Sequence, residues 1–250
     1  MKKQRADLLL VERGLAENAS KAQALIMAGS VLCGTKRIDK AGELLKPDAV
    51  LSVKGKDFPW VSRGGLKLVK GLEDSGVDPT GMVCIDVGCS TGGFTDVLLS
   101  RGAKKVYAVD VGYGQLAQKL RNDDRVVVLE RMNARYLTEE HISEEVDLIV
   151  CDASFIRLEK VLPRPMSFAK KTRAFLIALI KPQFEVEKYQ VGENGVVRDP
   201  SLHAAVCENV REWFSSQSGW TVKSLCQSPI KGPEGNIEFL ISAEFLRTEQ

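Results

Sequence analysis

The sequence lacks the features of a membrane-spanning or secreted protein. Its longest uninterrupted apolar run, Ala174 to Ile180, is much shorter than the roughly 20 residues that cross a bilayer. No signal-peptide pattern follows Met1, because the apolar stretch after the first basic residues is short and lies between Asp7 and Glu12. We therefore expect a cytoplasmic protein that has no membrane partner.

Zinc-type cysteine pairs are also absent. The six cysteines, at positions 33, 84, 89, 151, 207 and 226, include no Cys-x-x-Cys pair, so we expect no metal site. Several of them fall in apparent core strands. We interpret them as buried thiols of a protein in a reducing compartment.

Charge is distributed unevenly along the chain. The length of 250 residues and the hydrophobic content of 44% fit one medium domain with a small one attached. Residues 1–70 hold 14 Lys/Arg against 7 Asp/Glu, whereas the remainder holds 21 against 26. A basic module joined to a nearly neutral domain favours a polyanionic partner, although a solvated basic face is the simpler alternative.

A glycine-rich turn near residue 90 is the clearest ligand-binding pattern. The apolar run 83–87 leads into Gly88, and Gly92 and Gly93 precede an amphipathic segment, which predicts a buried strand, a tight turn and a helix N-terminus. The spacing Gly-x-x-x-Gly-Gly is not the dinucleotide pattern Gly-x-Gly-x-x-Gly. Asp86 would disfavour a pyrophosphate and suit an ammonium group, such as that of S-adenosyl-L-methionine. Asp110, about 20 residues beyond the glycines, suits a ribose diol. A glycine turn of another α/β enzyme is the alternative.

Strand and helix patterns alternate from residue 61 onward. We expect strands at 83–87, 105–110, 126–129, 146–151, 174–181, 220–228 and 236–245. Helical patterns lie near 65–75, 93–101, 115–122, 138–143, 156–170 and 200–217. Helical connections make the first five strands parallel, whereas the last two, joined without a helix, predict an antiparallel strand at the end of the sheet.

Two short helical patterns and a small β element make up the first 60 residues. Their motifs Val11-Glu-Arg-Gly-Leu15, Ser20-Lys-Ala and Leu25-Ile-Met-Ala-Gly-Ser-Val31 resemble the RNA-binding domain named after ribosomal small-subunit protein four. In that family the second helix and the following turn lie along structured RNA. The resemblance implies RNA contacts by Arg5, Lys21, Lys36, Arg37 and Lys40, and we add Arg63 from the junction. Lysine at position 21, where the family often has arginine, keeps the charge but loses bidentate hydrogen bonding.

Charged residues end two of the predicted strands, where reactive groups of open α/β sheets collect. Asp152 follows one apolar run, and Lys181 follows another, where burying an ammonium group is costly without a partner. Lys67 and Glu238 stand near further motifs. Taken singly, Lys67 and Glu238 could form an ordinary surface ion pair, and Asp152 could cap a helix.

Several motifs together resemble the TlyA family, in which the RNA-binding module is fused to an FtsJ/RrmJ-type ribose methyltransferase. The resemblance covers essentially the whole chain. Its motifs are Val61-Ser-Arg-Gly-Gly-Leu-Lys67, Asp86-Val-Gly-Cys-Ser-Thr-Gly-Gly-Phe-Thr-Asp96, Val109-Asp-Val-Gly-Tyr-Gly-Gln-Leu116, Cys151-Asp-Ala-Ser-Phe155, Lys181-Pro-Gln-Phe-Glu185 and Gly235-Asn-Ile-Glu238. It implies that Lys67, Asp152, Lys181 and Glu238 form the catalytic tetrad of 2′-O-methyltransferases.

The chemistry fits these residue types. A ribose 2′-hydroxyl needs a base within hydrogen-bond reach, and neutral Lys181 is the expected base. A second lysine and a cationic sulfonium both disfavour its charged form. Asp152 and Glu238 would orient the ammonium groups. The resemblance and the spacing assign the cofactor to Asp86, Gly88, Ser90, Gly92, Gly93, Phe94, Asp110 and Asn133, the last as the adenine contact.

The expected architecture has two domains. Residues 1–55 form a small α+β RNA-binding domain, 56–62 a linker in which Trp60 packs, and 63–250 a Rossmann-like class I methyltransferase domain with a doubly wound sheet of seven strands, the last antiparallel. We expect methyl transfer from S-adenosylmethionine to a ribose 2′-hydroxyl of ribosomal RNA, with cytidine as the expected nucleotide. The alternatives are a non-catalytic RNA-binding or ribosome-assembly factor and a membrane-active hemolysin. The residues give no oligomeric state.

Overall fold

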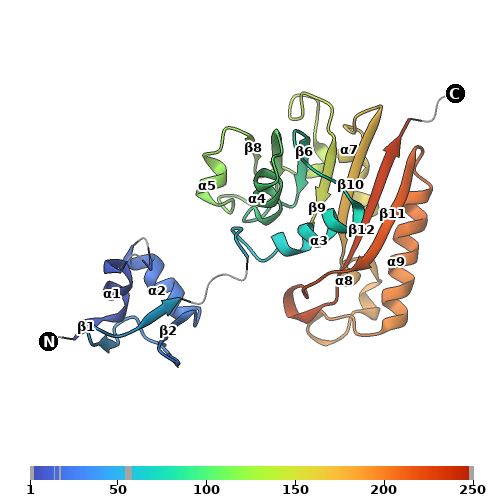
Figure 1. Ribbon diagram of the computed structural model, residues 1–250. Coiled ribbons are helices and arrows are strands. Elements are labelled where there is room, and N and C mark those ends of the chain that lie inside the picture. Colours follow the sequence, from blue (N-terminus) through green and yellow to red (C-terminus); the bar gives the residue numbers. More distant parts are fainter. Residues whose placement is uncertain (1–2, 14, 17, 54–57, 248–250) are drawn as a thin grey trace. The chain divides into compact units, whose positions relative to one another are not determined.

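The computed structural model describes residues 3–13, 15–16, 18–53 and 58–247. The chain divides into two compact units, Met1–Pro59 and Trp60–Gln250 (Figure 1). The linker expected at 56–62 spans this division, and its residues 56 and 57 lie outside the described part. Trp60 belongs to the second unit, where its ring packs over Gly65 and its Nε1 donates to Ser100 Oγ at 3.2 Å.

The first unit is a small α+β module with its own core. Asn18 caps the second helix by accepting a hydrogen bond from the backbone of Lys21, and Gly29, at φ +68°, follows the end of that helix. The apolar faces of the two helices and of the strands enclose a single cluster that includes Leu10 and Ile26. The elements are β1 Gln4–Arg5, α1 Ala6–Glu12, α2 Ala19–Met27, β2 Val31–Cys33, β3 Lys36–Arg37, β4 Leu44–Leu45 and β5 Leu51–Val53.

A seven-stranded sheet organises the second unit, in the order β11-β12-β10-β9-β6-β7-β8. Five strands pair in parallel, and β12 runs antiparallel to both β10 and β11, which confirms the expected fold. The strands are β6 Val83–Val87, β7 Lys105–Val109, β8 Val126–Leu129, β9 Leu148–Cys151, β10 Arg173–Ile180, β11 Trp220–Gln227 and β12 Phe239–Leu246.

Helices cover both faces of this sheet. Because side chains alternate along a strand, Val83, Ile85 and Val87 enter one apolar cluster and Cys84 enters the other. The first cluster includes α6 Leu158–Val161, α7 Pro163–Met166 and α9 Pro200–Ser215, and the second includes α3 Gly65–Ser75, α4 Gly93–Ser100 and α5 Gln118–Arg121. Figure 1 shows α9 alongside β11. The remaining short helices are α8 Pro182–Glu185, η1 Ala134–Tyr136, η2 Lys188–Gln190, η3 Glu193–Gly195 and η4 Pro233–Gly235.

Two of the expected helices are wrong. Residues 138–143 form turns, in which the backbone and hydroxyl of Thr138 bond to His141 Nδ1 at 3.1 and 2.8 Å, so that a local side-chain contact replaces helical continuation. The segment 156–170 contains two short helices in place of one. Pro163 starts the second of them, and proline cannot continue a helix that precedes it.

Candidate active site

The four residues of the expected tetrad come from four different elements. Lys67 lies in the first turn of α3, Asp152 directly follows β9, Lys181 directly follows β10 and Glu238 directly precedes β12. Because β12 is antiparallel, its start meets the carboxyl ends of β9 and β10 at one edge of the sheet. Lys67, Lys181 and Glu238 are buried, at 6%, 7% and 1% exposure.

The structure brings the four charged groups into one chain of alternating sign. Lys67 Nζ donates to Glu238 Oε2 at 2.6 Å and lies 3.8 Å from Asp152 Oδ2. Lys181 Nζ lies 2.6 Å from Asp152 Oδ1 as an ion pair outside hydrogen-bond geometry. Two ammonium groups and two carboxylates balance formally, so that each buried charge faces an opposite one.

Lys181 makes two further polar contacts. Its Nζ donates to the carbonyl oxygen of Asp152 at 3.0 Å and to Ser154 Oγ at 2.8 Å. Three oxygens therefore surround one ammonium group, and the geometry fixes its position. Among the described residues, Glu238 Oε1 accepts no hydrogen bond, and Gly232 lies so close that a Cβ there would stand 2.1 Å from this oxygen. Only glycine lets the loop before β12 approach the carboxylate in this way.

A cavity of about 610 Å³ adjoins Asp152 at the same edge of the sheet. Four of the expected cofactor residues line it, namely Gly88, Ser90, Asp110 and Asn133. The Asp110 carboxylate accepts from the backbone of Ser90 at 2.8 Å and from the backbone of Gly112 at 2.7 Å, which holds the two loops together. Gly88, at φ +80°, has only 3.0 Å to the backbone of Ala153 where a Cβ would stand. The turn is therefore shaped by close backbone approach.

The other expected cofactor residues lie beside or behind this cavity. Gly93 and Phe94 line a smaller one of about 110 Å³, together with Gly88, Ser90 and Asp152. Gly92, at φ +96°, packs against Leu116 and Leu120 and lines neither cavity. Asp86 also lines neither, because its side chain is completely buried in β6.

Asp86 combines burial with an unpaired oxygen. Its Oδ2 accepts from the backbone and the hydroxyl of Thr95 at 2.9 and 2.7 Å, whereas its Oδ1 has no hydrogen-bond partner among the described residues. Burial raises the pKa of Asp86 to about 7, and the two hydrogen bonds from Thr95 oppose that rise. A cationic group near Oδ1 would stabilise the ionised form.

Strained backbone at the cavity was not foreseen from the sequence. Ser90 and Phe155 both line the cavity with positive φ, at +47° and +64°. Such conformations cost about 1–3 kcal/mol for residues other than glycine and persist where the surroundings enforce them. Phe155 is 89% exposed, and its ring lies 4.8 Å from that of Phe184. Other contributors missed from the sequence are Ser154, two residues after Asp152 in the same motif, and the pair Ser62 and Gly64 in the smaller cavity.

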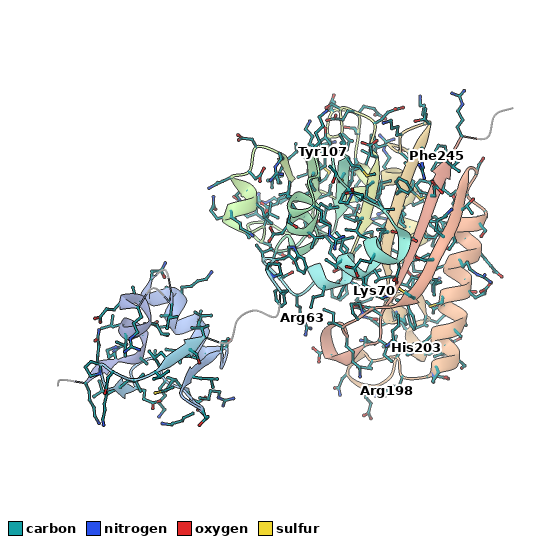
Figure 2. All side chains as sticks on the ribbon, in the orientation of Figure 1. Arg63, Lys70, Tyr107, Arg198, His203 and Phe245 are labelled. Atoms are coloured by element: carbon teal, nitrogen blue, oxygen red, sulfur yellow. The ribbon has the colours of Figure 1, made fainter. Side chains whose placement is uncertain are left out.

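The six basic side chains expected to contact RNA are all exposed, but they belong to different units. Five lie in the first unit, and Arg63 lies on the segment that leads into α3 (Figure 2). Three of the five pair with carboxylates of their own unit: Arg5 with Asp7 at 2.7 Å, Lys36 with Glu43 at 2.8 Å and Arg37 with Asp39 at 2.6 Å. Lys21 and Lys40 have no ion pair among the described residues.

The loop between β10 and α9, long enough in sequence to close over a substrate, is anchored in the structure. Asn236 is buried, its Oδ1 accepts from the backbone of Val197 at 3.1 Å and its Nδ2 donates to Gly195 O at 3.0 Å. Val197 O also lies 2.9 Å from His203 Nε2. The loop is thereby tied to the segment that carries Glu238.

The structure also describes the hydrophobicity of the helices and the state of the cysteines. None of the described helices is long and apolar enough to cross a membrane. All six cysteines are free thiols, four of them buried.

Comparison with known proteins assigns both units. The family model of FtsJ-like methyltransferases matches residues 60–245, and that of the S4 domain matches residues 4–51. A protein of Mycobacterium tuberculosis named 16S/23S rRNA (cytidine-2′-O)-methyltransferase TlyA is 48% identical over 250 residues, covering 98% of this chain and 90% of the relative. The chain belongs to the TlyA family of FtsJ-like methyltransferases.

Further relatives carry two kinds of name. The Bacillus subtilis protein "Putative rRNA methyltransferase YqxC" is 49% identical and covers 96% of this chain and 85% of the relative. A solved structure described as "Putative hemolysin from Streptococcus thermophilus" superposes with a TM-score of 0.75 at 43% identity, over all of this chain and 91% of that one. A solved structure therefore shares the fold of this TlyA-family chain along the whole length of the chain.

Proposed function

We propose that this protein transfers a methyl group from S-adenosylmethionine to the ribose 2′-hydroxyl of a cytidine in ribosomal RNA. The observation that carries the proposal is the buried chain of charges from Glu238 through Lys67 and Asp152 to Lys181, at the edge of a cavity lined by the glycine turn. Membership of the TlyA family, with relatives named for this reaction, supports the choice of acceptor.

Each of the four residues has a distinct role in the proposed reaction. Lys181 accepts the proton that leaves the 2′-hydroxyl, because the oxygen becomes nucleophilic only as that proton is lost. Asp152 holds the Lys181 nitrogen beside the cavity through its carboxylate and its carbonyl oxygen. Lys67 and Glu238 form the second ion pair, which fixes the other carboxylate oxygen of Asp152 from behind. Fixed charges of this kind act by positioning the reacting atoms.

The residues present fit S-adenosylmethionine. Asp110 has a carboxylate, which can accept hydrogen bonds from a ribose diol. Asn133 lines the same cavity as the proposed adenine contact, and Gly88 and Ser90 supply the close backbone of the turn. The unpaired Oδ1 of buried Asp86 is the oxygen that a nearby ammonium group would satisfy. Gly93 and Phe94 line the adjoining space, and Gly92 shapes the turn. When bound, the cofactor supplies an electrophilic methyl carbon.

The first unit supplies affinity for RNA in this proposal. Residues 1–55 act as the RNA-binding module, with Arg5, Lys21, Lys36, Arg37 and Lys40 on phosphates, and Arg63 adds a contact from the methyltransferase domain, 63–250. The S4 match and the excess of basic residues support this role. The substrate is ribosomal RNA or a ribosomal subunit, which places the activity in the cytoplasm.

A labelling experiment tests the proposal. The protein is incubated with methyl-labelled S-adenosylmethionine and ribosomal RNA, free or in subunits, and the RNA is then hydrolysed with alkali. Because alkaline cleavage needs a free 2′-hydroxyl, the label should survive in an alkali-resistant dinucleotide with a cytidine on its 5′ side. Replacing the proposed base, Lys181→Ala, should lower labelling by about 10³-fold or more while the protein remains folded.

The other outcomes identify the alternatives. Label in a base would mean a different methyl acceptor. RNA binding without label on free RNA or on either subunit would favour a non-catalytic assembly factor. A wild-type protein that labels no RNA but lyses erythrocytes, with the same lysis by Lys181→Ala, would favour the hemolysin named among the relatives.

A further inference from the structure

The proposed base, Lys181, does not itself line the cavity. Its side chain is 8% exposed, and it is not among the residues that line the cavity of about 610 Å³. Ser154 is exposed and lines that cavity, and its hydroxyl oxygen accepts a hydrogen bond from Lys181 Nζ at 2.8 Å. An RNA ribose that enters this cavity beside the cofactor would therefore meet the hydroxyl of Ser154 before it meets the amine of Lys181.

The three oxygens around Lys181 Nζ differ in one property. The carboxylate and the carbonyl oxygen of Asp152 can only accept hydrogen bonds, whereas the hydroxyl of Ser154 can both accept and donate. When Lys181 is neutral, it has two N–H groups and one lone pair. One N–H group donates to the carbonyl oxygen of Asp152 and the other faces its carboxylate, so the lone pair turns toward Ser154, the only one of the three partners that carries a proton to give.

We propose that Ser154 is a catalytic residue that relays the proton of the ribose 2′-hydroxyl to Lys181. This proposal rests on the proposed function and deepens it, since it names the group that touches the acceptor. The observation that carries it is the position of Ser154, which bonds to the buried amine on one side and opens into the cavity on the other.

The proposed relay conserves protons and electron pairs. The 2′-hydroxyl donates its proton to Ser154 Oγ while Ser154 gives its own proton to the lone pair of Lys181 Nζ. The serine hydroxyl is regenerated, and the lysine ends as the ammonium that faces Asp152. The electron pair freed on the 2′-oxygen forms the bond to the methyl carbon as the carbon–sulfur bond breaks, and that bond's electron pair stays on sulfur.

Asp152 is a poorer relay, although it also lines the cavity. Its carboxylate already faces both lysines, at 2.6 and 3.8 Å. Protonating it would remove a negative partner of the buried Lys67 ammonium group while Lys181 is still neutral, a costly change in a buried site. The hydroxyl of Ser154 passes a proton without any change in its own charge.

The test compares three chains in single-turnover methylation of ribosomal subunits from a strain that lacks the protein. Ser154→Ala should lower the methylation rate by about 10²-fold, in the range of general acid–base contributions. Ser154→Thr keeps a hydroxyl on the same carbon and should retain the rate within about tenfold. The dissociation constants for S-adenosylhomocysteine and for the subunits should change by less than about threefold in both variants, because the serine acts on the transition state.

A proton inventory separates a relay from a structural role. In mixtures of light and heavy water, two protons in flight should give the wild type a curved dependence of rate on deuterium fraction, and Ser154→Ala should give a straight line. A Ser154→Ala rate within about threefold of wild type would overturn the relay alone. So would a slow Ser154→Ala chain that keeps the wild-type curvature, since that marks a structural effect. A wild-type chain that methylates no 2′-hydroxyl would overturn the proposed function and the relay with it.

Discussion

The two units of this protein place basic side chains in opposite environments. In the first unit the basic side chains lie in water: Lys36 and Arg37 pair with carboxylates that are themselves at least partly exposed, and Arg5 pairs with the buried carboxylate of Asp7. In the second unit the side chains of Lys67 and Lys181 are each only 8% exposed, and the two lysines share two carboxylates. Exposed pairs contribute little and can exchange their partner for a phosphate, whereas buried pairs cannot be opened without leaving a charge in the protein interior. The first arrangement suits a surface that binds RNA, and the second suits a site whose geometry must not vary.

The largest effect should come from breaking the buried pair. Lys67→Met leaves Glu238, whose side chain is completely buried, without its 2.6 Å partner, and should lower the free energy of unfolding by about 3–5 kcal/mol. The measurement is urea unfolding followed by tryptophan fluorescence. All three tryptophans, Trp60, Trp213 and Trp220, lie in the second unit and report on it alone.

A surface pair on the same helix provides the control. Lys70 pairs with Asp74 at 2.6 Å, but its side chain is 42% exposed, so Lys70→Ala should cost about 0.5 kcal/mol or less. Adding Glu238→Gln to Lys67→Met should recover much of the lost stability, because no unpaired carboxylate then remains. Equal losses for Lys67→Met and Lys70→Ala would show that burial does not distinguish the two kinds of pair.

The strands and the charged residues at their ends could be predicted from the sequence, because both depend on local patterns. Strands 83–87 and 126–129 were predicted to the residue, since short apolar runs bounded by turn residues have few alternative structures. Asp152 and Lys181 follow apolar runs directly, and parallel strands bring such ends to one edge. The expected helix at 138–143 was wrong because a contact between Thr138 and His141 outweighs a weak helical pattern there.

The sequence could not predict which side chains of a motif line a cavity, which pack against neighbours and which are buried. Gly92 and Asp86 belong to the same motif as Gly88, yet only Gly88 lines a cavity, because the turn directs successive residues toward packing, burial and open space. Ser154 stands two residues from Asp152, but its bond to Lys181 joins two strand ends across 27 positions of the chain. Such contacts depend on tertiary packing that periodicity does not encode.

A second, intermediate effect concerns the buried carboxyl of Asp86. Burial raises its pKa to about 7, so its neutral form favours folding at low pH, and this contribution is lost as pH rises through 7. A ligand that places an ammonium group near Oδ1 favours the ionised form instead. The affinity for S-adenosylhomocysteine should therefore rise by about tenfold from pH 6 to pH 8, as the carboxyl loses its proton.

Asp86→Asn isolates this dependence. The amide cannot ionise, so the variant should bind the ligand weakly at both pH values, with a nearly flat profile measured by isothermal titration calorimetry. Proton uptake or release in buffers of different ionisation enthalpy gives a second readout, and the wild type should release a proton on binding at pH 6. A flat wild-type profile would place the ammonium group away from Asp86.

The smallest effect belongs to a single exposed charge of the first unit. Lys40 is exposed and unpaired among the described residues, so Lys40→Ala should weaken binding to ribosomal RNA by only a few-fold at physiological salt. Because each phosphate contact releases counterions, the slope of log affinity against log salt should fall by about 0.7–0.9. Lys46 is another exposed lysine of the same unit and lies outside the expected set, so Lys46→Ala is the matched control and should leave the slope unchanged. Filter binding at several salt concentrations measures both variants, and cofactor affinity should be the same in each, because the buried charges of the second unit are untouched. An unchanged slope for Lys40→Ala would mean that Lys40 contacts no phosphate. A loss of cofactor affinity would mean that a charge of the first unit affects the cofactor site of the second.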